Sequence, residues 1–162
     1  MRLYFLRHAS ASDVAPSDAE RKLTKEGEEE SRIAGAALAQ LGVKPARIFS
    51  SPLARARQTA EIAARELKFT GPVEILDELL NDASTSVLLK ALKSYGNADE
   101  LLLVGHMPSL AEHVAGLIGA KTADGLPLGK GGAACVDLKS LRIGNGQLRW
   151  LMRQKQLREF VR

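Results

Sequence analysis

Leu3-Tyr4-Phe5-Leu6-Arg7-His8-Ala9 reads as a short buried strand that turns polar where it ends. In open α/β sheets the carboxyl ends of the strands face the crevice in which ligands bind. An Arg-His pair delivered to that crevice lies where a base, a nucleophile or an anion clamp belongs. Taken alone, the same residues fit a strand followed by two solvated side chains equally well. The choice between these interpretations therefore depends on the rest of the chain.

Short apolar runs alternate with stretches of helical spacing along most of the sequence. Further strands are predicted over 47–50, 73–76 and 101–104, and helices over 24–41, 51–67, 84–94 and 108–118. Thr24 is a good N-cap, and Ser51 followed by Pro52 predicts a helix that starts at once after its strand. This alternation is typical of βαβ units with a mainly parallel sheet.

The last third of the chain has a different pattern. Runs at 131–138 and 147–152 flank Gly144-Asn145-Gly146, which predicts an antiparallel hairpin. The expected fold is therefore a three-layer α/β structure. A mixed, mostly parallel sheet is flanked by helices and ends in a C-terminal hairpin.

Composition indicates an ordinary globular protein. With 162 residues, 45% of them hydrophobic and 26% charged, we expect one domain over 1–162. No apolar stretch approaches the length of a membrane span, and Arg7 interrupts the first run too early for a signal peptide. Cys135 lies alone in an apolar run and is interpreted as a core residue in a reducing compartment. A cytoplasmic location follows as an expectation.

The net charge of +4 is concentrated toward the C-terminus. Residues 142–162 hold six Lys/Arg and one acid, and Trp150 is the only aromatic in the middle of this segment. A basic segment of this kind is usually a solvated face, although it can also steer an acidic partner. The segment has no interleaved aromatic side chains on which bases could stack, so nucleic acid is not expected as a partner.

Three predicted strands end in residues of related chemistry. Arg7-His8 follows the first strand, Ser51 and Arg55 follow the second, and His106 lies between a strand and a helix that starts near Pro108. If the strands are parallel neighbours, these ends converge on one pocket. Guanidinium groups and helix N-termini favour an anion there, and two arginine forks match phosphate oxygens.

Such a set can transfer a phosphoryl group without a metal or cofactor, because that chemistry depends mainly on positioning and charge stabilisation. A neutral histidine is a suitable nucleophile. A zinc site is the alternative for two histidines, but catalytic zinc takes three protein ligands. The third histidine, His113, lies within a helix and is interpreted as a surface or core residue.

The order of these motifs resembles the histidine phosphatase superfamily, the phosphoglycerate mutase-like proteins. The resemblance runs from Met1 to about Met152, and within the superfamily it is closest to the short SixA-type phosphohistidine phosphatases. The motifs that carry it are Arg7-His8-Ala9, Ser17-Asp18-x-x-Arg21-x-Leu23-Thr24-x-x-Gly27, Ser51-Pro52-Leu53-Ala54-Arg55-Ala56-Arg57-Gln58-Thr59 and Gly105-His106-x-Pro108. Ala9 departs from the pattern, since the superfamily often has glycine there.

The resemblance implies a role for each matching position. His8 is the residue that becomes phosphorylated, Arg7 and Arg55 clamp the phosphate, and His106 is the second pocket histidine. Glu78, in a Leu-x-Glu context, matches the general acid of many members. Three further phosphate contacts are expected: the Met107 backbone, Ser51 and Arg21. Asp18 is expected to hold its loop through Arg21, and Lys130 is a further candidate for substrate contact.

The function implied is removal of phosphate from a phosphohistidine on a protein, such as a histidine phosphotransfer domain, through phospho-His8. Short members of the family lack the helical insertion around the acid. An imidazole with its other nitrogen protonated leaves as a neutral ring, so a weak acid would favour phosphohistidine over phosphate monoesters. A phosphatase of small phosphomonoesters is the alternative among enzymes. A non-catalytic module that binds a phosphoprotein or nucleic acid is the alternative of another class.

Overall fold

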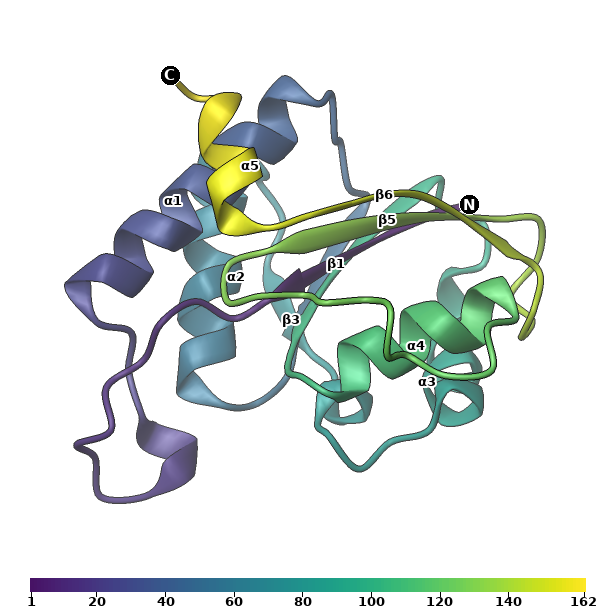
Figure 1. Cartoon of the computed structure of the whole chain (residues 1–162), viewed down its shortest axis with the longest axis horizontal. Helices are drawn as coiled ribbons and strands as arrows, with labels where there is room; N and C mark the ends of the chain where they lie inside the picture. The colour runs from purple at the N-terminus through teal and green to yellow at the C-terminus, as the bar shows by residue number, and fades with distance from the viewer.

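The computed structural model describes all of residues 1–162. Six strands form one mixed sheet. The strands are β1 (Arg2–Arg7), β2 (Arg47–Ser50), β3 (Val73–Ile75), β4 (Glu100–Gly105), β5 (Ala133–Leu138) and β6 (Gly146–Met152). Their order is β3-β2-β4-β1-β5-β6 (Figure 1). The first four strands run parallel, whereas β5 is antiparallel to β1 and β6 to β5. The predicted sheet and its C-terminal hairpin are confirmed.

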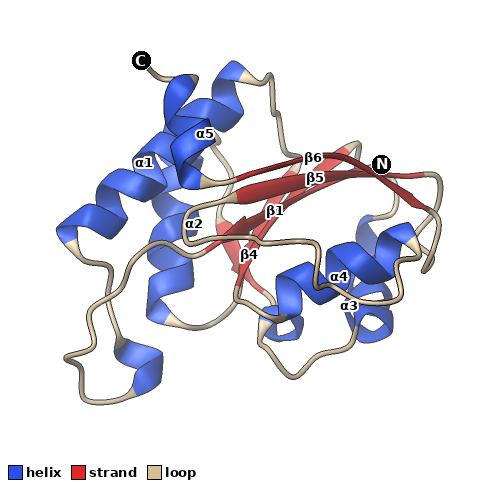
Figure 2. Cartoon of the chain, in the orientation of Figure 1, coloured by secondary structure: helices blue, strands red, loops and turns tan.

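Helices cover both faces of this sheet and complete the predicted three layers (Figure 2). One face packs against α1 (Lys25–Gln40), α2 (Ala54–Glu66) and α5 (Gln154–Glu159), and the other packs against α3 (Thr85–Leu92) and α4 (Ser109–Ile118). Three short 3₁₀ turns lie in the connections: η1 (Asp18–Glu20), η2 (Asp77–Leu79) and η3 (Lys93–Tyr95).

Strand alternation explains why the sheet has a core on each side. Tyr4 and Leu6 of β1 point into the core beneath α1 and α2, while Leu3 and Phe5 point into the core beneath α3 and α4. Successive side chains of a strand face opposite sides, so an entirely apolar strand must be covered twice. Each large apolar side chain buried in this way contributes roughly 1.5–3 kcal/mol.

The two helices that flank the first strand ends begin differently. The Thr24 side chain accepts a hydrogen bond from Gly27 N–H and caps α1, as predicted. The predicted start of the next helix at Ser51 is wrong, because α2 begins at Ala54 with Leu53 as its N-cap. The Ser51 hydroxyl lies 2.6 Å from a ring nitrogen of His106. The Ser51 hydroxyl therefore contacts His106 and does not cap α2.

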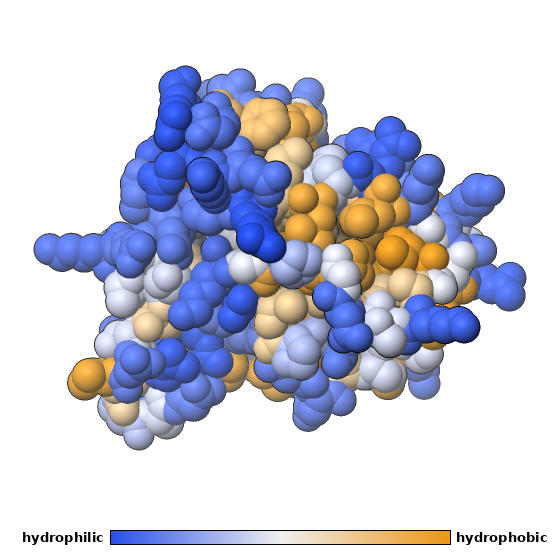
Figure 3. All heavy atoms as spheres, viewed as in Figure 1, coloured by the Kyte–Doolittle hydropathy of each residue, from blue (hydrophilic) through white to orange (hydrophobic).

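The C-terminal segment contains a helix that the sequence pattern did not predict. Helix α5 packs on α1, where the hydrogen bond from Arg32 lowers the pKa of Glu29 and the charge of Arg158 on α5 lowers it further. One basic residue of this segment, Arg158, thus acts on an acidic side chain of α1. Figure 3 shows the resulting polar surface over α1 and α5, beside an apolar patch over β5 and β6.

The environment of Cys135 and the character of the helices agree with what the composition indicates. Cys135 is buried in β5, where burial raises the pKa of its thiol to about 12, in agreement with a core role. None of the helices has both the length and the apolar character that crossing a bilayer requires.

Candidate active site

The register of the sheet brings the two strand-end histidines together. Arg7 of β1 pairs with Gly105 of β4, so the residues that follow them leave the sheet side by side. The His8 N–H donates to the Gly105 carbonyl at 3.0 Å, and the rings of His8 and His106 have centroids 5.0 Å apart. The predicted convergence of these two residues is thus a direct result of parallel pairing.

His8 presents one nitrogen as an electron-pair donor. Its Nδ1 lies 2.8 Å from the Ala9 carbonyl oxygen. Because a carbonyl only accepts hydrogen bonds, Nδ1 carries the proton and Nε2 keeps its lone pair. Burial lowers the pKa of His8 to about 4, and the charges of Arg55 and Arg7 act in the same direction. The ring is therefore neutral and nucleophilic at neutral pH.

His106 is held from the opposite side of its ring. Its Nε2 lies 2.6 Å from Ser51 Oγ, while its buried Nδ1 has no hydrogen-bond partner. Burial lowers the pKa of His106 to about 3, with further lowering by His8 and Arg55. Asp18 opposes this shift. The result is a second neutral imidazole whose Nδ1 makes no hydrogen bond within the protein.

Each of the two arginines is anchored by main-chain oxygens. Arg7 Nη1 donates to the Leu128 carbonyl at 3.2 Å, in the loop before β5. Arg55, in the first turn of α2, donates from Nη1 to the Asp18 carbonyl at 2.9 Å and from Nη2 to Asp18 Oδ2 at 3.3 Å. Their charges reach both histidines. The guanidinium groups are therefore fixed beside the rings.

Unpartnered polar atoms are concentrated at this place. Four buried side-chain nitrogen or oxygen atoms of the chain lack a hydrogen-bond partner, and three of them are Arg7 Nε, Arg55 Nε and His106 Nδ1. Leaving a buried donor unpaired costs roughly 1–3 kcal/mol, and such groups in native proteins call for an explanation. Three unpartnered nitrogens, two of them on cationic side chains, fit a ligand with several acceptor oxygens and negative charge.

The strand end that carries His8 is held by residues for which the sequence analysis had no role. Thr59 of α2 accepts a hydrogen bond from Ala9 N–H at 3.1 Å and donates to the Arg55 carbonyl at 2.7 Å. Glu30 accepts from Ser10 N–H at 2.8 Å. A Cβ on Gly27 would lie 1.9 Å from the Ser10 carbonyl oxygen, so only glycine allows α1 this close.

Thr59 and Gly27 belong to motifs that could have indicated these contacts. The contact of Arg7 with the Leu128 carbonyl could not be predicted from the sequence, because any residue type at position 128 would supply the same main-chain oxygen. Gln154 is similar, since its Nε2 donates to the Gly131 carbonyl at 2.9 Å and so ties α5 to that loop.

The remaining predicted site residues, Glu78, Met107, Arg21 and Lys130, lie on four different segments. Glu78 lies half-buried in η2, which packs beside the end of β4. The Met107 N–H makes no main-chain hydrogen bond. Arg21 donates to the Ser12 carbonyl, to Asp13 and to Asp18, all within its own loop, so the expected link between Arg21 and Asp18 is present. The charge of Lys130 contributes to the low pKa of His8.

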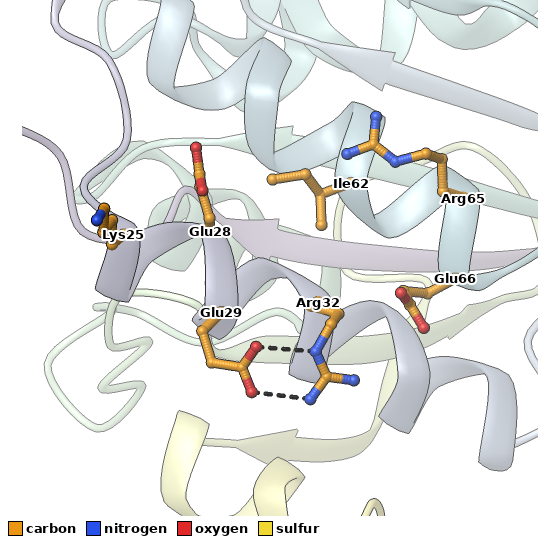
Figure 4. A pocket seen from close by; sticks show the side chains of 7 residues that line it. All are labelled: Lys25, Glu28, Glu29, Arg32, Ile62, Arg65 and Glu66. Carbon is orange, nitrogen blue, oxygen red and sulfur yellow. Dashed lines mark hydrogen bonds and ion pairs between the residues drawn. The ribbon is translucent and has the colours of Figure 1, made fainter.

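The groove between α1 and α2 and the third histidine, His113, lack the unpartnered nitrogens found around His8 and His106. A surface groove between α1 and α2 is lined by charged side chains of both signs, among them the ion pair of Arg32 with Glu29 (Figure 4). His113 is buried in α4, which agrees with the core alternative of its prediction, and both of its ring nitrogens have hydroxyl partners.

The model of the histidine phosphatase superfamily (branch 1) matches residues 3–83. Phosphohistidine phosphatase SixA of Escherichia coli is 31% identical over 155 residues, which cover 94% of this chain and 93% of that protein. The chain belongs to the histidine phosphatase superfamily. An uncharacterised protein of a Picosynechococcus strain is 40% identical over 138 residues, 82% of each chain.

Solved structures of the superfamily share the fold. The structure of the protein histidine phosphatase SixA complexed with tungstate has a TM-score of 0.88 and 30% sequence identity, and the match covers 97% of this chain and 99% of that one. The phosphoglycerate mutase-like architecture expected from the motifs is thereby confirmed. Membership of the superfamily makes the chain a phosphatase, and it leaves the substrate to be identified from the site itself.

Proposed function

We propose that the chain removes phosphate from a phosphohistidine on a protein, with His8 as the residue that is transiently phosphorylated. The observation that carries this proposal is the set of three buried, unpartnered nitrogens around the neutral ring of His8. A phosphoryl group offers three oxygens and negative charge to the donors of Arg7, Arg55 and His106. The resemblance to SixA, a named phosphohistidine phosphatase, supports the same substrate class.

The first step transfers the phosphoryl group to His8. Nε2 attacks phosphorus in line, the Nε2–P bond forms, and the P–N bond of the substrate breaks with its electron pair going to the leaving imidazole. That imidazole leaves as a neutral ring because its other nitrogen carries a proton. The donors of Arg7, Arg55 and His106 stabilise the charge on the equatorial oxygens during transfer.

The second step releases phosphate and restores the enzyme. A water molecule attacks phosphorus on phospho-His8, the Nε2–P bond breaks, and its electron pair returns to the ring. Dihydrogen phosphate leaves with both protons of the water. The hydrogen bond from Nδ1–H to the Ala9 carbonyl holds the same tautomer through both steps.

Ser51 sets the tautomer of the second histidine in this scheme. Its oxygen accepts from the Leu53 N–H at 3.4 Å, and its own hydrogen is available to Nε2 of His106. The neutral His106 ring then carries its proton on Nδ1, directed at the phosphoryl group as a donor. Glu78 and the Met107 backbone complete the proposed surroundings, with Glu78 as an accessory acid for leaving groups other than imidazole.

The proposed partner is a phosphorylated protein with its phosphohistidine on an accessible surface, such as a histidine phosphotransfer domain. The proposed location is the cytoplasm, where the unpaired Cys135 stays reduced. Nucleic acid is not among the proposed partners. Helix α5 of the basic C-terminal segment packs against α1, where Arg158 acts on Glu29.

The experiment that tests this function traps the phosphoenzyme. The protein is mixed with a ³²P-labelled histidine phosphotransfer domain and quenched, and label on the chain is assayed for acid lability and alkali stability. We expect such label on the wild type and none on His8→Ala, with His113→Gln as a labelled control. No label from any donor would favour a binding module. Label from an aryl phosphate but not from phosphohistidine would favour a phosphatase of small monoesters.

A further inference from the structure

Asp18 places a negative charge at the edge of a pocket built for an anion. It lies in η1, within the lobe formed by residues 10–22 that extends from the body of the protein (Figure 1). Its Oδ2 accepts a hydrogen bond from Arg55 Nη2 at 3.3 Å, and its charge raises the pKa of His106 against the other influences on that ring. Asp18 therefore faces the same space as the phosphoryl clamp.

A carboxylate in this position is unfavourable for binding a simple phosphate. It occupies a donor of the clamp and repels a doubly negative phosphoryl group. The anchoring of Arg55 does not require the charge, because Nη1 already donates to the Asp18 main-chain carbonyl at 2.9 Å. The carboxylate makes chemical sense if the ligand brings a positive charge next to its phosphate.

A phosphohistidine brings that charge. When the ring nitrogen distant from phosphorus is protonated, the substrate combines a negative phosphoryl group with a cationic imidazolium ring. A phosphate monoester has no such cation. The pocket mirrors this arrangement, with Arg7 and Arg55 for the phosphoryl group and a carboxylate beside them.

The Asp18 carboxylate has the capacity for one more donor. A carboxylate offers about four acceptor positions. Two of them are used, by Arg55 and by Arg21 Nη1 at 3.2 Å. The side chain is 67% exposed, so a ring that enters from solvent can reach it. The ion pair to Arg21 also fixes the lobe on which Asp18 stands.

We propose that Asp18 accepts a hydrogen bond from the distal ring N–H of the substrate phosphohistidine and keeps that ring protonated until the P–N bond breaks. This proposal rests on the proposed function. The protonated ring leaves as neutral imidazole, whereas the unprotonated ring would have to leave as an anion. Asp18 is thus a substrate-recognition residue that makes the site selective for phosphohistidine over phosphomonoesters.

The test compares Asp18→Asn with the wild type on two substrates, a phosphohistidine-containing phosphotransfer domain and p-nitrophenyl phosphate. Asparagine keeps an oxygen for Arg55 and the main-chain carbonyl. We expect kcat/KM on phosphohistidine to fall by about 10- to 100-fold, the range for losing a charge-assisted hydrogen bond. On p-nitrophenyl phosphate we expect no fall or a small rise, because the repelling charge is gone.

The dependence of kcat on pH gives a second readout that a merely structural role would not change. In the wild type, the charge of Asp18 raises the pKa of the bound imidazolium, so turnover of phosphohistidine persists to higher pH than in Asp18→Asn. The groups that face Asp18 are Arg21, Arg55 and His106, and all of them are unchanged in the variant.

Asp13→Asn is the matched control. Asp13 accepts a hydrogen bond from Arg21 on the same lobe at 3.1 Å and makes no bond to Arg55. The variant therefore removes the same charge from the lobe and leaves the contacts of Arg55 intact. We expect both activities to stay at wild-type levels. Equal losses on both substrates in Asp18→Asn would show that Asp18 only positions Arg55, and no loss on either would show no role. Both results overturn the proposal. A wild type that hydrolyses p-nitrophenyl phosphate but not phosphohistidine overturns the proposed function as well.

Discussion

His106 and His113 lie on either side of the first turn of α4, and both are buried, yet their hydrogen bonding differs. Burial lowers the pKa of His106 to about 3 and of His113 to about 4, so both rings are neutral at neutral pH. His113 has Thr85 Oγ1 3.0 Å from Nδ1 and Ser109 Oγ 2.9 Å from Nε2. His106 has one partner, Ser51, and one free nitrogen.

This difference separates a histidine that holds helices together from one that awaits a ligand. The contact with Thr85 joins α3 to α4, the contact with Ser109 lies within α4, and together they leave the ring nitrogens no free position. Burial and a shifted pKa do not distinguish the two residues. The unpaired nitrogen does, because a buried donor without a partner lowers stability unless a bound ligand completes it.

Exchange of each histidine should give the largest contrast. We expect His106→Ala to lower kcat by about 100- to 1,000-fold, as does loss of one donor to a developing negative charge. His113→Gln should leave kcat near the wild-type value because both ring nitrogens of His113 are occupied by Thr85 and Ser109 and offer the phosphoryl group no donor. Steady-state kinetics on p-nitrophenyl phosphate would measure both. A comparable loss in the two variants would break the comparison.

The same contrast applies to arginines. Arg55 has a buried Nε without a partner, whereas Arg32 forms two bonds of 2.8 Å to Glu29 on the surface of α1 (Figure 4). We expect Arg55→Lys to lower kcat/KM by about 10- to 100-fold, because lysine lacks the planar fork that binds phosphate oxygens.

Arg32→Lys is the corresponding control on a half-exposed surface ion pair, and it should leave kcat/KM unchanged. If Arg55→Lys kept wild-type kinetics on both phosphohistidine and p-nitrophenyl phosphate, the clamp role of Arg55 would have to be withdrawn.

His113 should control stability rather than activity, in a pH-dependent way. Burial lowers its pKa from 6.5 to about 4, so between these values the unfolded chain takes up a proton that the native state excludes. Stability therefore decreases as the pH falls below 6.5. From pH 7 to pH 5 this single group should remove about 2 kcal/mol of unfolding free energy.

Urea unfolding of wild type and His113→Gln at both pH values would measure this contribution. His8 and His106 add the same trend to both proteins, so the difference in slope isolates His113. We expect the variant to lose about 2 kcal/mol less than the wild type on acidification. Identical pH dependence in the two proteins would show that His113 is not a neutral, buried ring in the native state.

The smallest expected effect concerns the hydroxyl that orients His106. Ser51→Ala removes the partner of Nε2, so the ring proton is no longer confined to Nδ1. We expect kcat to fall by about 5-fold, the value of one neutral hydrogen bond. Ser50→Ala is the control, since the Ser50 hydroxyl donates only to the Ser51 carbonyl. An unchanged kcat in Ser51→Ala would show that His106 selects its tautomer without help.

The sequence by itself determined the layered fold and the meeting of strand ends. Short apolar runs between amphipathic stretches predicted β1, β2 and β4, and parallel pairing predicted that His8 and His106 would be neighbours. Local periodicity is sufficient for these conclusions because burial on both faces requires an apolar strand, and covering helices require an amphipathic pattern.

Tertiary structure alone decided how the site is completed. Ser51 has the local pattern of a helix cap, but a residue 55 positions away uses its hydroxyl. Arg7 is held by a carbonyl 121 positions away, and Arg55 by Asp18 from an exposed lobe. No local sequence pattern encodes such contacts. Every residue type has the same main-chain oxygen, so the sequence does not mark which carbonyl will accept a hydrogen bond. Where a side chain has two available partners, only the packing of the whole chain decides which of them it binds.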